Sequence, residues 1–191
     1  MKSTTPATAE SFDYRKRREF IKSKVRSIPD WPIDGVIFRD ITTLLQDPKA
    51  HREVCAIFYD RYANQQIDKV VGIDARGFLF GSVLAYKLDI GFVPIRKKGK
   101  LPYKTISESY TLEYGKETVE IHEDGLSANE RVVIIDDLMA TGGTIAAAVN
   151  LVEKLGAEIV ECAFVVELPD LNGKAKLNGH KVFSIVEFEG E

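Results

Sequence analysis

The sequence predicts an α/β fold in which a mostly parallel β-sheet is flanked by helices, and three observations support this class. Short runs of β-branched and apolar residues alternate along the chain with longer segments of helical periodicity. The run Val132-Val133-Ile134-Ile135 is apolar throughout, which is typical of a strand buried on both faces of a parallel sheet. Charged residues follow directly after several of these runs, at the sheet edge where α/β proteins bind ligands.

The length and composition fit one globular domain. At 191 residues the chain has room for a single domain, residues 1–191, with a sizeable core. Its hydrophobic content of 45% and charged content of 29% are ordinary for such a domain. The formal net charge of −3 disfavours a general affinity for nucleic acid or acidic membranes. The sequence has no signal-peptide core and no apolar run long enough to cross a bilayer, so we expect a cytoplasmic protein without nucleic-acid or membrane partners.

The cysteines and histidines form no recognisable metal or disulfide pattern. Cys55 and Cys162 lie in apolar surroundings, so we expect two buried thiols in a reducing compartment. His51, His122 and His180 are scattered and lack the spacing of a metal-binding motif. The sequence therefore predicts no metal site made by the protein alone.

Periodicity and turn residues predict the first elements. Residues 1–12 are rich in small polar residues and predict a flexible tail. Apolar residues recur at near-helical spacing over residues 13–26. Residues 29–43 predict a loop with a short strand around Val36-Ile37-Phe38. The pair Asp47-Pro48 predicts a helix to about residue 63, because Asp caps helix amino ends and Pro fits the first turn.

The remaining segments alternate between strands and helices, with one interruption. Residues 101–129 are polar and alternate in hydrophobicity around Gly115, which predicts a β-hairpin. Long insertions of this kind are often mobile lids, and we assign the lid to about residues 98–122. The other elements that we expect are strands at 69–73, 91–95, 132–135, 158–166 and 182–188, helices at 78–88 and 144–155, and a loop at 169–179.

A phosphate-binding loop is predicted directly after the strand at 132–135. Asp136 and Asp137 follow that strand, at the carboxyl edge of the sheet. In the Thr-Gly-Gly-Thr sequence at 141–144, Gly142 and Gly143 allow positive φ angles, and the amide groups that open the next helix can bind an anion. Carboxylates repel phosphate, so two acids beside such a loop imply a ligand that also carries hydroxyl groups or a metal ion. A ribose phosphate has both features.

Two further turns place charged residues at the same edge. The sequence Asp74-Ala75-Arg76-Gly77 follows the strand at 69–73 and repeats the order of strand, polar turn and helix. The strand at 91–95 is followed by four cations, Arg96, Lys97, Lys98 and Lys100. Beside a phosphate loop, these cations predict a site for further anionic groups of the ligand.

The strand, paired acids and Thr-Gly-Gly-Thr loop resemble the phosphoribosyl pyrophosphate motif of the type I phosphoribosyltransferases. Further motifs resemble the adenine phosphoribosyltransferases within that family: Gly35-Val36-Ile37-Phe38-Arg39-Asp40-Ile41, Gly72-Ile73-Asp74-Ala75-Arg76-Gly77-Phe78, Ile95-Arg96-Lys97-Lys98-Gly99-Lys100-Leu101-Pro102 and Ser109-Tyr110-Thr111-Leu112-Glu113-Tyr114-Gly115-Lys116. The resemblance extends over nearly everything from residue 14 to 189. It implies the type I phosphoribosyltransferase fold with a β-hairpin lid and a small N-terminal hood segment. It also implies a homodimeric purine-salvage transferase that converts adenine and phosphoribosyl pyrophosphate to AMP and pyrophosphate with Mg²⁺.

The resemblance implies a role for each part of the predicted site. Asp136 and Asp137 would accept hydrogen bonds from the ribose 2′- and 3′-hydroxyl groups. The 5′-phosphate would be held by Ala140, Thr141, Gly142, Gly143 and Thr144. Pyrophosphate would be held by Asp74, Ala75, Arg76, Lys97, Lys100 and Tyr114, and the peptide bond after Asp74 is often cis in this family. Mg²⁺ would bind mainly through the substrate.

The implied catalytic residues are Glu113, Arg76 and Lys97. Arg76 and Lys97 would neutralise the departing pyrophosphate. Related hypoxanthine–guanine enzymes have an Asp in the phosphate loop where this chain has Ala140, so the acid that meets the purine imidazole edge must come from elsewhere. Glu113 on the lid is the implied acid, and Tyr114 would close beside it.

Adenine recognition is implied for Ile37, Phe38 and Arg39. In the family, this segment stacks an aromatic ring on the purine and reads its Watson–Crick edge largely through backbone groups. The pattern has one visible departure at Ile37, where a close aliphatic equivalent is usual.

Two alternatives to this function stay open. The first is a phosphoribosyltransferase for another base, such as xanthine or orotate; for the orotate carboxylate, Arg39 is the one evident cation in that segment. The second is a non-catalytic regulator that senses phosphoribosyl pyrophosphate. The short segment before Asp13 has no room for a DNA-binding domain, and Glu113 would be unnecessary in a sensor, so we expect the enzyme.

Overall fold

The computed structural model describes residues 9–112 and 115–190, which fall into two compact units. The first unit ends at Val54 and the second comprises Cys55–Gly190. The assignment of a single domain stays a prediction. Most of the predicted tail, residues 1–8, lies outside the described residues, and residues 9–12 are already helical because α1 begins at Ala9.

The first unit contains α1 (Ala9–Ser23), a small antiparallel sheet of β1 (Arg26–Ile28) and β2 (Phe38–Asp40), and α2 (Thr42–Gln46). Arg26 pairs with Asp40 in the register of this sheet, and its Nη2 donates to Asp40 Oδ2 at 2.6 Å. This sheet is the small N-terminal segment that the fold class predicted. The predicted strand around Val36-Ile37-Phe38 lies slightly later in the chain, because pairing with β1 fixes Phe38–Asp40 rather than the apolar tripeptide.

Helix α3 (Pro48–Tyr62) begins where the sequence predicts. Asp47 Oδ1 accepts hydrogen bonds from the backbone amides of Lys49 and Ala50, at 2.9 and 3.1 Å, which is the expected arrangement for a capping acid. The predicted apolar stripe Val54, Ile57, Phe58 and Tyr62 is buried. In the second unit, the Phe58 ring contacts Phe80 and Phe183, so the last turns of α3 pack through aromatic edges.

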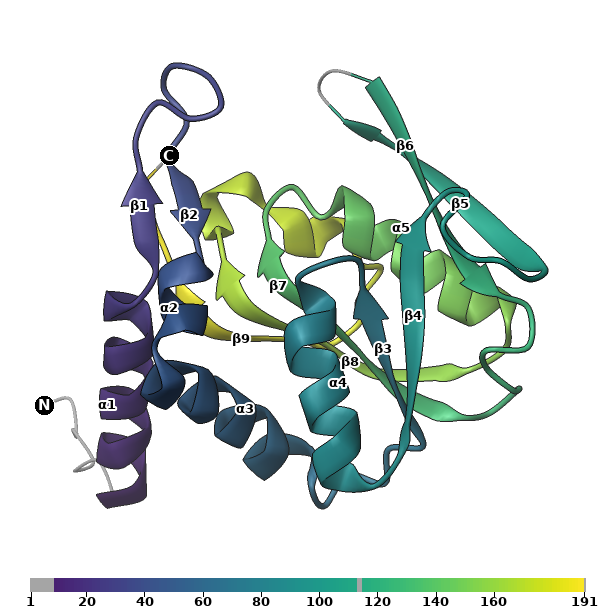
Figure 1. The fold of residues 1–191 in the computed structure, drawn as a ribbon, viewed down its shortest axis with the longest axis horizontal. Helices are drawn as coiled ribbons and strands as arrows, with labels where there is room; N and C mark the ends of the chain where they lie inside the picture. The colour runs from purple at the N-terminus through teal and green to yellow at the C-terminus, as the bar shows by residue number, and fades with distance from the viewer. Residues whose placement is uncertain (1–8, 113–114, 191) are drawn as a thin grey trace, which may run out of the picture. The chain divides into compact units, whose positions relative to one another are not determined.

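The second unit is built on a seven-stranded sheet in the order β5-β6-β4-β3-β7-β8-β9 (Figure 1). The pairs β4–β3, β3–β7, β7–β8 and β8–β9 are parallel, whereas β6 joins β4 in antiparallel orientation. The predicted mostly parallel sheet is therefore confirmed. Its strands are β3 (Lys69–Ile73), β4 (Gly91–Lys97), β5 (Thr105–Leu112), β6 (Gly115–His122), β7 (Arg131–Met139), β8 (Glu158–Glu167) and β9 (Val182–Glu187).

Helices α4 (Gly77–Leu88) and α5 (Gly143–Lys154) cover opposite faces of this sheet (Figure 1). A Cβ atom added to Gly81 of α4 would lie 3.4 Å from Val70 Cγ1, so Val70 faces α4. The next residue, Val71, belongs instead to the core cluster that contains Leu151 of α5. Because successive strand residues point to opposite faces, the two helices lie on the two sides of β3.

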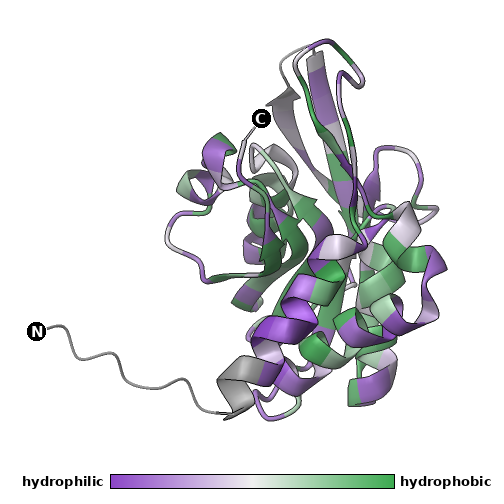
Figure 2. Ribbon diagram, turned by 90° about the vertical axis from the view of Figure 1, so that its left-hand side faces the viewer, coloured by the Kyte–Doolittle hydropathy of each residue, from purple (hydrophilic) through white to green (hydrophobic). Residues whose placement is uncertain are grey.

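The core of this unit is made of apolar strands between apolar helix faces. Val71, Ile134, Ala148 and Leu151 are all completely buried in one cluster. Figure 2 shows the central strands as predominantly hydrophobic. Burial of each large aliphatic side chain contributes about 1.5–3 kcal/mol, so this cluster fixes the strands that carry the site.

The predicted hairpin is confirmed as β5 and β6, which pair from Thr105 with His122 to Leu112 with Gly115. It is attached to α5 through Glu108, which accepts from Lys154 Nζ at 2.5 Å and from Asn150 Nδ2 at 3.2 Å. That the hairpin is a mobile lid stays a prediction. The predicted loop at 169–179 contains two 3₁₀ turns, η1 (Pro169–Leu171) and η2 (Gly173–Lys176).

Candidate functional site

Asp136 and Asp137 lie within β7 rather than after it, which corrects the predicted end of the strand. The pairing of β3 with β7 ends at Gly72 and Ile135. On its other side, β7 continues to pair with β8 through Asp136 and up to Met139. At the carboxyl end of the sheet, the segment with the two acids is therefore paired with β8 but no longer with β3.

Burial controls the charge of the two acids. The Asp137 amide donates to Asp136 Oδ1 at 2.9 Å, and the Asp137 residue is only 3% exposed. Burial, reinforced by the adjacent Asp137 carboxylate, raises the pKa of Asp136 well above its ordinary value. Burial also raises the pKa of Asp137, although the Arg76 guanidinium, with Nε 2.7 Å from Asp137 Oδ2, counteracts the rise. The pair is therefore suited to hydroxyl donors or cations.

The turn after β3 lies against both neighbouring strands. The Asp74–Ala75 peptide bond is cis, as the resemblance implied. The Asp74 amide donates to the Ile95 carbonyl on β4, and Arg96 Nε lies 2.9 Å from Asp74 Oδ2. On the other side, a Cβ atom on Gly77 would lie 2.5 Å from the Ile135 carbonyl oxygen, so glycine is required there. The turn after β3 thus contacts residues of both neighbouring strands, β4 and β7, at one edge of the sheet.

The predicted end of the strand at 91–95 is corrected, because pairing with β6 extends β4 through Arg96 and Lys97. The cations at this end of β4 divide into two groups. Lys97 Nζ lies 3.0 Å from the Glu117 carboxylate on β6, and this hydrogen bond raises the pKa of Lys97. The Lys97 side chain is still 61% exposed, so it remains accessible to a ligand. Lys100 is exposed in the turn that follows. Arg96, which was predicted only as one of four cations, instead supports the Asp74 turn.

The phosphate loop leads from β7 into α5. Gly142 has φ +77°, as predicted, but the second glycine does not adopt a positive φ angle. Gly143 is the first residue of α5, and a Cβ atom there would lie 3.0 Å from Tyr110 Cδ2. Thr144 Oγ1 donates to the Tyr110 hydroxyl at 3.1 Å. Ala140 and Thr141 occupy the turn before Gly142. The loop therefore ends at the amino end of a helix, a position at which backbone amides can bind an anion.

The three residues predicted for adenine lie in the first unit. Phe38 is half-buried, and its ring contacts the Trp31 ring at a centroid distance of 4.4 Å in an edge arrangement. Arg39 is 8% exposed, and its Nη1 donates to Ser27 Oγ at 2.6 Å. Ile37 is also half-buried. Trp31 was not predicted, although an aromatic residue beside a Pro-rich turn was visible in the sequence.

Two predicted residues cannot be placed. Glu113 and Tyr114, at the tip of the hairpin, lie outside the described residues, so their roles stay predictions.

The described residues include no helix long and apolar enough to span a membrane. Within residues 9–112 and 115–190, no group of three or more His, Cys, Asp or Glu side chains is arranged to hold a metal ion. Cys55 and Cys162 are free and buried, as predicted.

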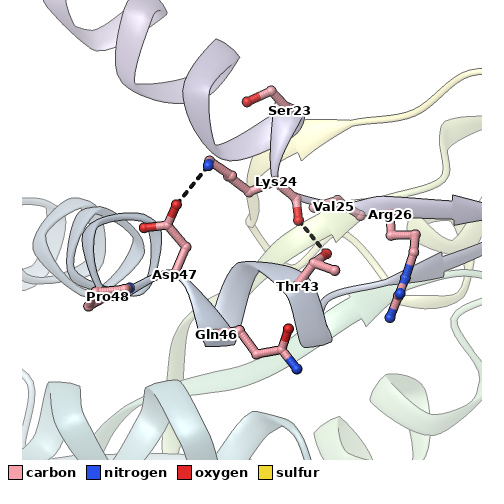
Figure 3. A pocket seen from close by; sticks show the side chains of 8 residues that line it. All are labelled: Ser23, Lys24, Val25, Arg26, Thr43, Gln46, Asp47 and Pro48. Atoms are coloured by element: carbon pink, nitrogen blue, oxygen red, sulfur yellow. Dashed lines mark hydrogen bonds and ion pairs between the residues drawn. The ribbon is translucent and has the colours of Figure 1, made fainter.

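A hollow of about 680 Å³ lies in the first unit, away from the predicted site residues in the sequence (Figure 3). Lys24 Nζ lies 2.7 Å from Asp47 Oδ2 at its wall, and Thr43 Oγ1 donates to the Lys24 carbonyl at 2.7 Å. Its lining residues are Ser23, Lys24, Val25, Arg26, Thr43, Gln46, Asp47 and Pro48. Because none of them belongs to the predicted site, this hollow is not assigned to it.

Known proteins with these features identify the family. The model of the family described as "Phosphoribosyl transferase domain" matches residues 40–189. The adenine phosphoribosyltransferase of Desulfosudis oleivorans is 61% identical over 171 residues, which is 90% of this chain and 99% of that protein. The chain therefore belongs to the phosphoribosyltransferase family, in the branch of the adenine phosphoribosyltransferases.

Solved structures agree with this assignment. The crystal structure of adenine phosphoribosyltransferase from Thermoanaerobacter pseudethanolicus matches with a TM-score of 0.86 and 46% identity, covering 90% of this chain and 99% of that one. The enzyme from Saccharomyces cerevisiae, in complex with D-2,5-dideoxy-2,5-imino-altritol 1,6-bisphosphate and adenine, matches with a TM-score of 0.86 and 38% identity. The coverage is again 90% of this chain and 99% of that one.

Proposed function

We propose that this chain converts adenine and 5-phosphoribosyl 1-pyrophosphate to AMP and pyrophosphate, using the β7 acids and the α5 amino end as the sugar-phosphate site. The observation that carries the proposal is that β7, which carries Asp136 and Asp137 near its carboxyl end, leads through residues 140–142 directly into the amino end of α5. Hydroxyl-binding carboxylates beside an anion-binding helix terminus match a ribose 5-phosphate. In this site, Asp136 and Asp137 accept from the 2′- and 3′-hydroxyls, and Ala140, Thr141, Gly142, Gly143 and Thr144 hold the 5′-phosphate.

The pyrophosphate group is bound by the turn after β3 and by the end of β4 with the turn that follows it. Arg76 and Lys97 are the catalytic cations, because breaking the bond at ribose C1 builds negative charge on the leaving group. In the structure, each cation is held by a carboxylate, Arg76 by Asp137 and Lys97 by Glu117. Their side chains are 49% and 61% exposed, so both can turn towards a phosphate without leaving a packed core. Asp74, Ala75, Lys100 and Tyr114 complete this part of the site.

Mg²⁺ is the proposed cofactor, bound mainly through the substrate. The oxygen donors of Asp136 and Asp137 are of the kind that Mg²⁺ prefers, but Arg76 already contacts Asp137, which favours a metal that keeps most of its ligands from substrate and water. When bound, the metal would offset charge on the pyrophosphate. Arg76 and Lys97 orient the same group from the protein side.

The base is recognised and deprotonated by separate segments. Ile37, Phe38 and Arg39 bind adenine, with the Phe38 ring as the stacking surface. Glu113 accepts the proton that adenine N9 loses as the new bond forms, and Tyr114 closes beside it. Closure of a lid at about residues 98–122 excludes water, which would otherwise compete with adenine for the activated sugar. A cytoplasmic homodimer completes the proposal, by analogy with the family.

The test is a competition assay with Mg²⁺, phosphoribosyl pyrophosphate and equal adenine, hypoxanthine, guanine, xanthine and orotate, with products separated by chromatography. AMP as the sole nucleotide is the expected result. A different nucleotide would keep the transferase reaction and overturn the assignment of base recognition to Ile37, Phe38 and Arg39. If no nucleotide forms and calorimetry shows tight binding of phosphoribosyl pyrophosphate, the result would support the regulator that senses this ligand.

A further inference from the structure

The connection between β8 and β9 packs backbone to backbone against the phosphate loop. Gly173, the first residue of η2, is buried and faces Gly142. A Cβ atom on Gly142 would collide with the Gly173 carbonyl oxygen and lie 2.9 Å from Gly173 Cα. A Cβ atom on Gly173 would collide with the Ala140 carbonyl oxygen and lie 3.1 Å from the Gly142 nitrogen. No side chain can separate these two backbone segments without moving one of them.

A buried carboxylate holds the turn that carries Gly173. Glu167, at the end of β8, is 3% exposed. Its Oε1 lies 2.8 Å from Lys174 Nζ, and its Oε2 accepts from Ser184 Oγ on β9 at 2.6 Å. In the sheet, Glu167 pairs with Met139, the last residue of β7 before the phosphate loop. Glu167 therefore holds the turn through its side chain, while its backbone lies beside the strand that leads into the loop.

Both ends of the turn are fixed to the unit as well. The Leu168 amide donates to the Met139 carbonyl at 3.0 Å, just before η1 begins. Leu177, which follows η2, is 1% exposed and belongs to the core cluster beneath α5. The turn is thus anchored before, within and after the glycine that touches the loop.

We propose that the turn at residues 172–177 positions the phosphate loop, through Gly173 and Lys174, and thereby sets the affinity for the 5′-phosphate of phosphoribosyl ligands. This inference rests on the proposed function. The loop amides bind phosphate only if they converge on it, and a misplacement of about 1 Å can cost on the order of 100-fold in a positioned site. Gly173 and Lys174 do not touch the reacting atoms, so they are positioning residues.

The first experiment compares Gly173→Ala with Gly179→Ala in the full chain. Gly179 has φ +86°, and its added Cβ atom would meet nothing within 4 Å, so this control introduces backbone strain in the same connection without a collision. Calorimetry measures the Kd of ribose 5-phosphate and, separately, of pyrophosphate with Mg²⁺. For Gly173→Ala we expect the Kd of ribose 5-phosphate to rise by about tenfold or more and that of pyrophosphate to stay within about twofold. For Gly179→Ala both values should match the unmodified chain.

The outcomes separate the inference from the proposed function. An unmodified chain that does not bind ribose 5-phosphate overturns the proposed function and the inference with it. An unmodified chain that binds it, together with an unchanged Kd for Gly173→Ala, overturns the inference alone. Equal weakening of ribose 5-phosphate and pyrophosphate would show general damage to the fold and would also overturn it.

A second set of variants tests the anchor and does not depend on the folding of Gly173→Ala. Lys174→Met should weaken ribose 5-phosphate binding, and Lys174→Arg should restore it because the cation can still reach Glu167. Glu167→Gln distinguishes two roles of Lys174, which could hold the turn in place or could itself attract the phosphate. If Lys174 holds the turn, phosphate binding becomes weaker in Glu167→Gln, since Lys174 loses its charged partner. Direct attraction by Lys174 predicts unchanged or tighter binding in Glu167→Gln, and that result would overturn the inference.

Discussion

Replacing Arg76 by Met should destabilise the ligand-free protein by leaving the Asp137 carboxylate without its cation. Asp137 is 4% exposed at its side chain, and removal of one partner from a fully buried ion pair costs about 3–5 kcal/mol. Arg76 is 49% exposed, so solvent screens the pair, and we expect a loss of about 1–3 kcal/mol. For a chain of this size, a loss of about 2 kcal/mol lowers Tm by about 4–8 °C.

The loss of stability caused by Arg76→Met should become larger as pH rises from 4 to 7. Because burial raises the pKa of Asp137 above its ordinary value of 3.8, ionisation of this group disfavours the folded state as pH rises from that value through the folded pKa. Removal of Arg76 raises this pKa further, so the difference between variant and unmodified protein is largest at neutral pH and shrinks as pH falls towards 4.

Calorimetric melting from pH 4 to 8 measures this effect, with Lys98→Met as a control that removes an exposed cation. A double-mutant cycle with Asp137→Asn isolates the pair, because Arg76→Met should cost much less when the carboxylate is absent. A Tm unchanged at pH 7, or an equal loss in the Asp137→Asn background, would refute the reasoning.

Three further predictions address the mechanism, the packing of the turn after β3 and the thiols. Glu113→Gln should keep the fold and phosphoribosyl pyrophosphate binding but lower turnover; unchanged turnover would remove Glu113 from the mechanism. Gly77→Ala should reduce the free energy of unfolding in urea by about 1–3 kcal/mol, because its Cβ atom would overlap the Ile135 carbonyl oxygen; an unchanged urea midpoint would contradict this close approach. Burial raises the pKa of Cys55 to about 11 and of Cys162 to about 12, so neither thiol should react with a thiol reagent at pH 8 until urea unfolds the protein; rapid labelling of the native chain would contradict their burial.

The elements that could be predicted are those that a local sequence pattern is sufficient to form. The strand at Lys69–Ile73 is found at the predicted residues, because its apolar run is stable only where both faces of a strand are buried. The strand β1 and the five-residue helix α2 were missed, because β1 exists only through pairing with β2 and neither is long enough to show a periodicity. The predicted end of β7 was wrong for a related reason. Pairing with β8 extends the strand past Asp136 and Asp137, whose charge ends the apolar run by which the strand was predicted.

The same distinction holds in the site. The acids and the glycine with positive φ belong to one contiguous motif, and the cis peptide after Asp74 was implied by the resemblance of a second motif; the structure contains all of these features. The contacts of Arg96, Tyr110 and Gly173 were not predicted, because each of these residues lies against a partner distant in sequence: Asp74, Thr144 and the loop around Gly142, respectively. Arg96 was predicted only as one of four cations that face the ligand.

The hydrogen bond from Thr144 to Tyr110 connects the phosphate loop to the hairpin. Under the proposed function, a 5′-phosphate that accepts from the Thr144 hydroxyl takes the proton that Thr144 now donates to Tyr110, and the Tyr110 hydroxyl must then act as the donor of the pair. Phosphate binding is thereby coupled to the orientation of one hydroxyl group on β5. By thermodynamic reciprocity, a change in the hairpin that favours the reversed bond strengthens phosphate binding by the same factor.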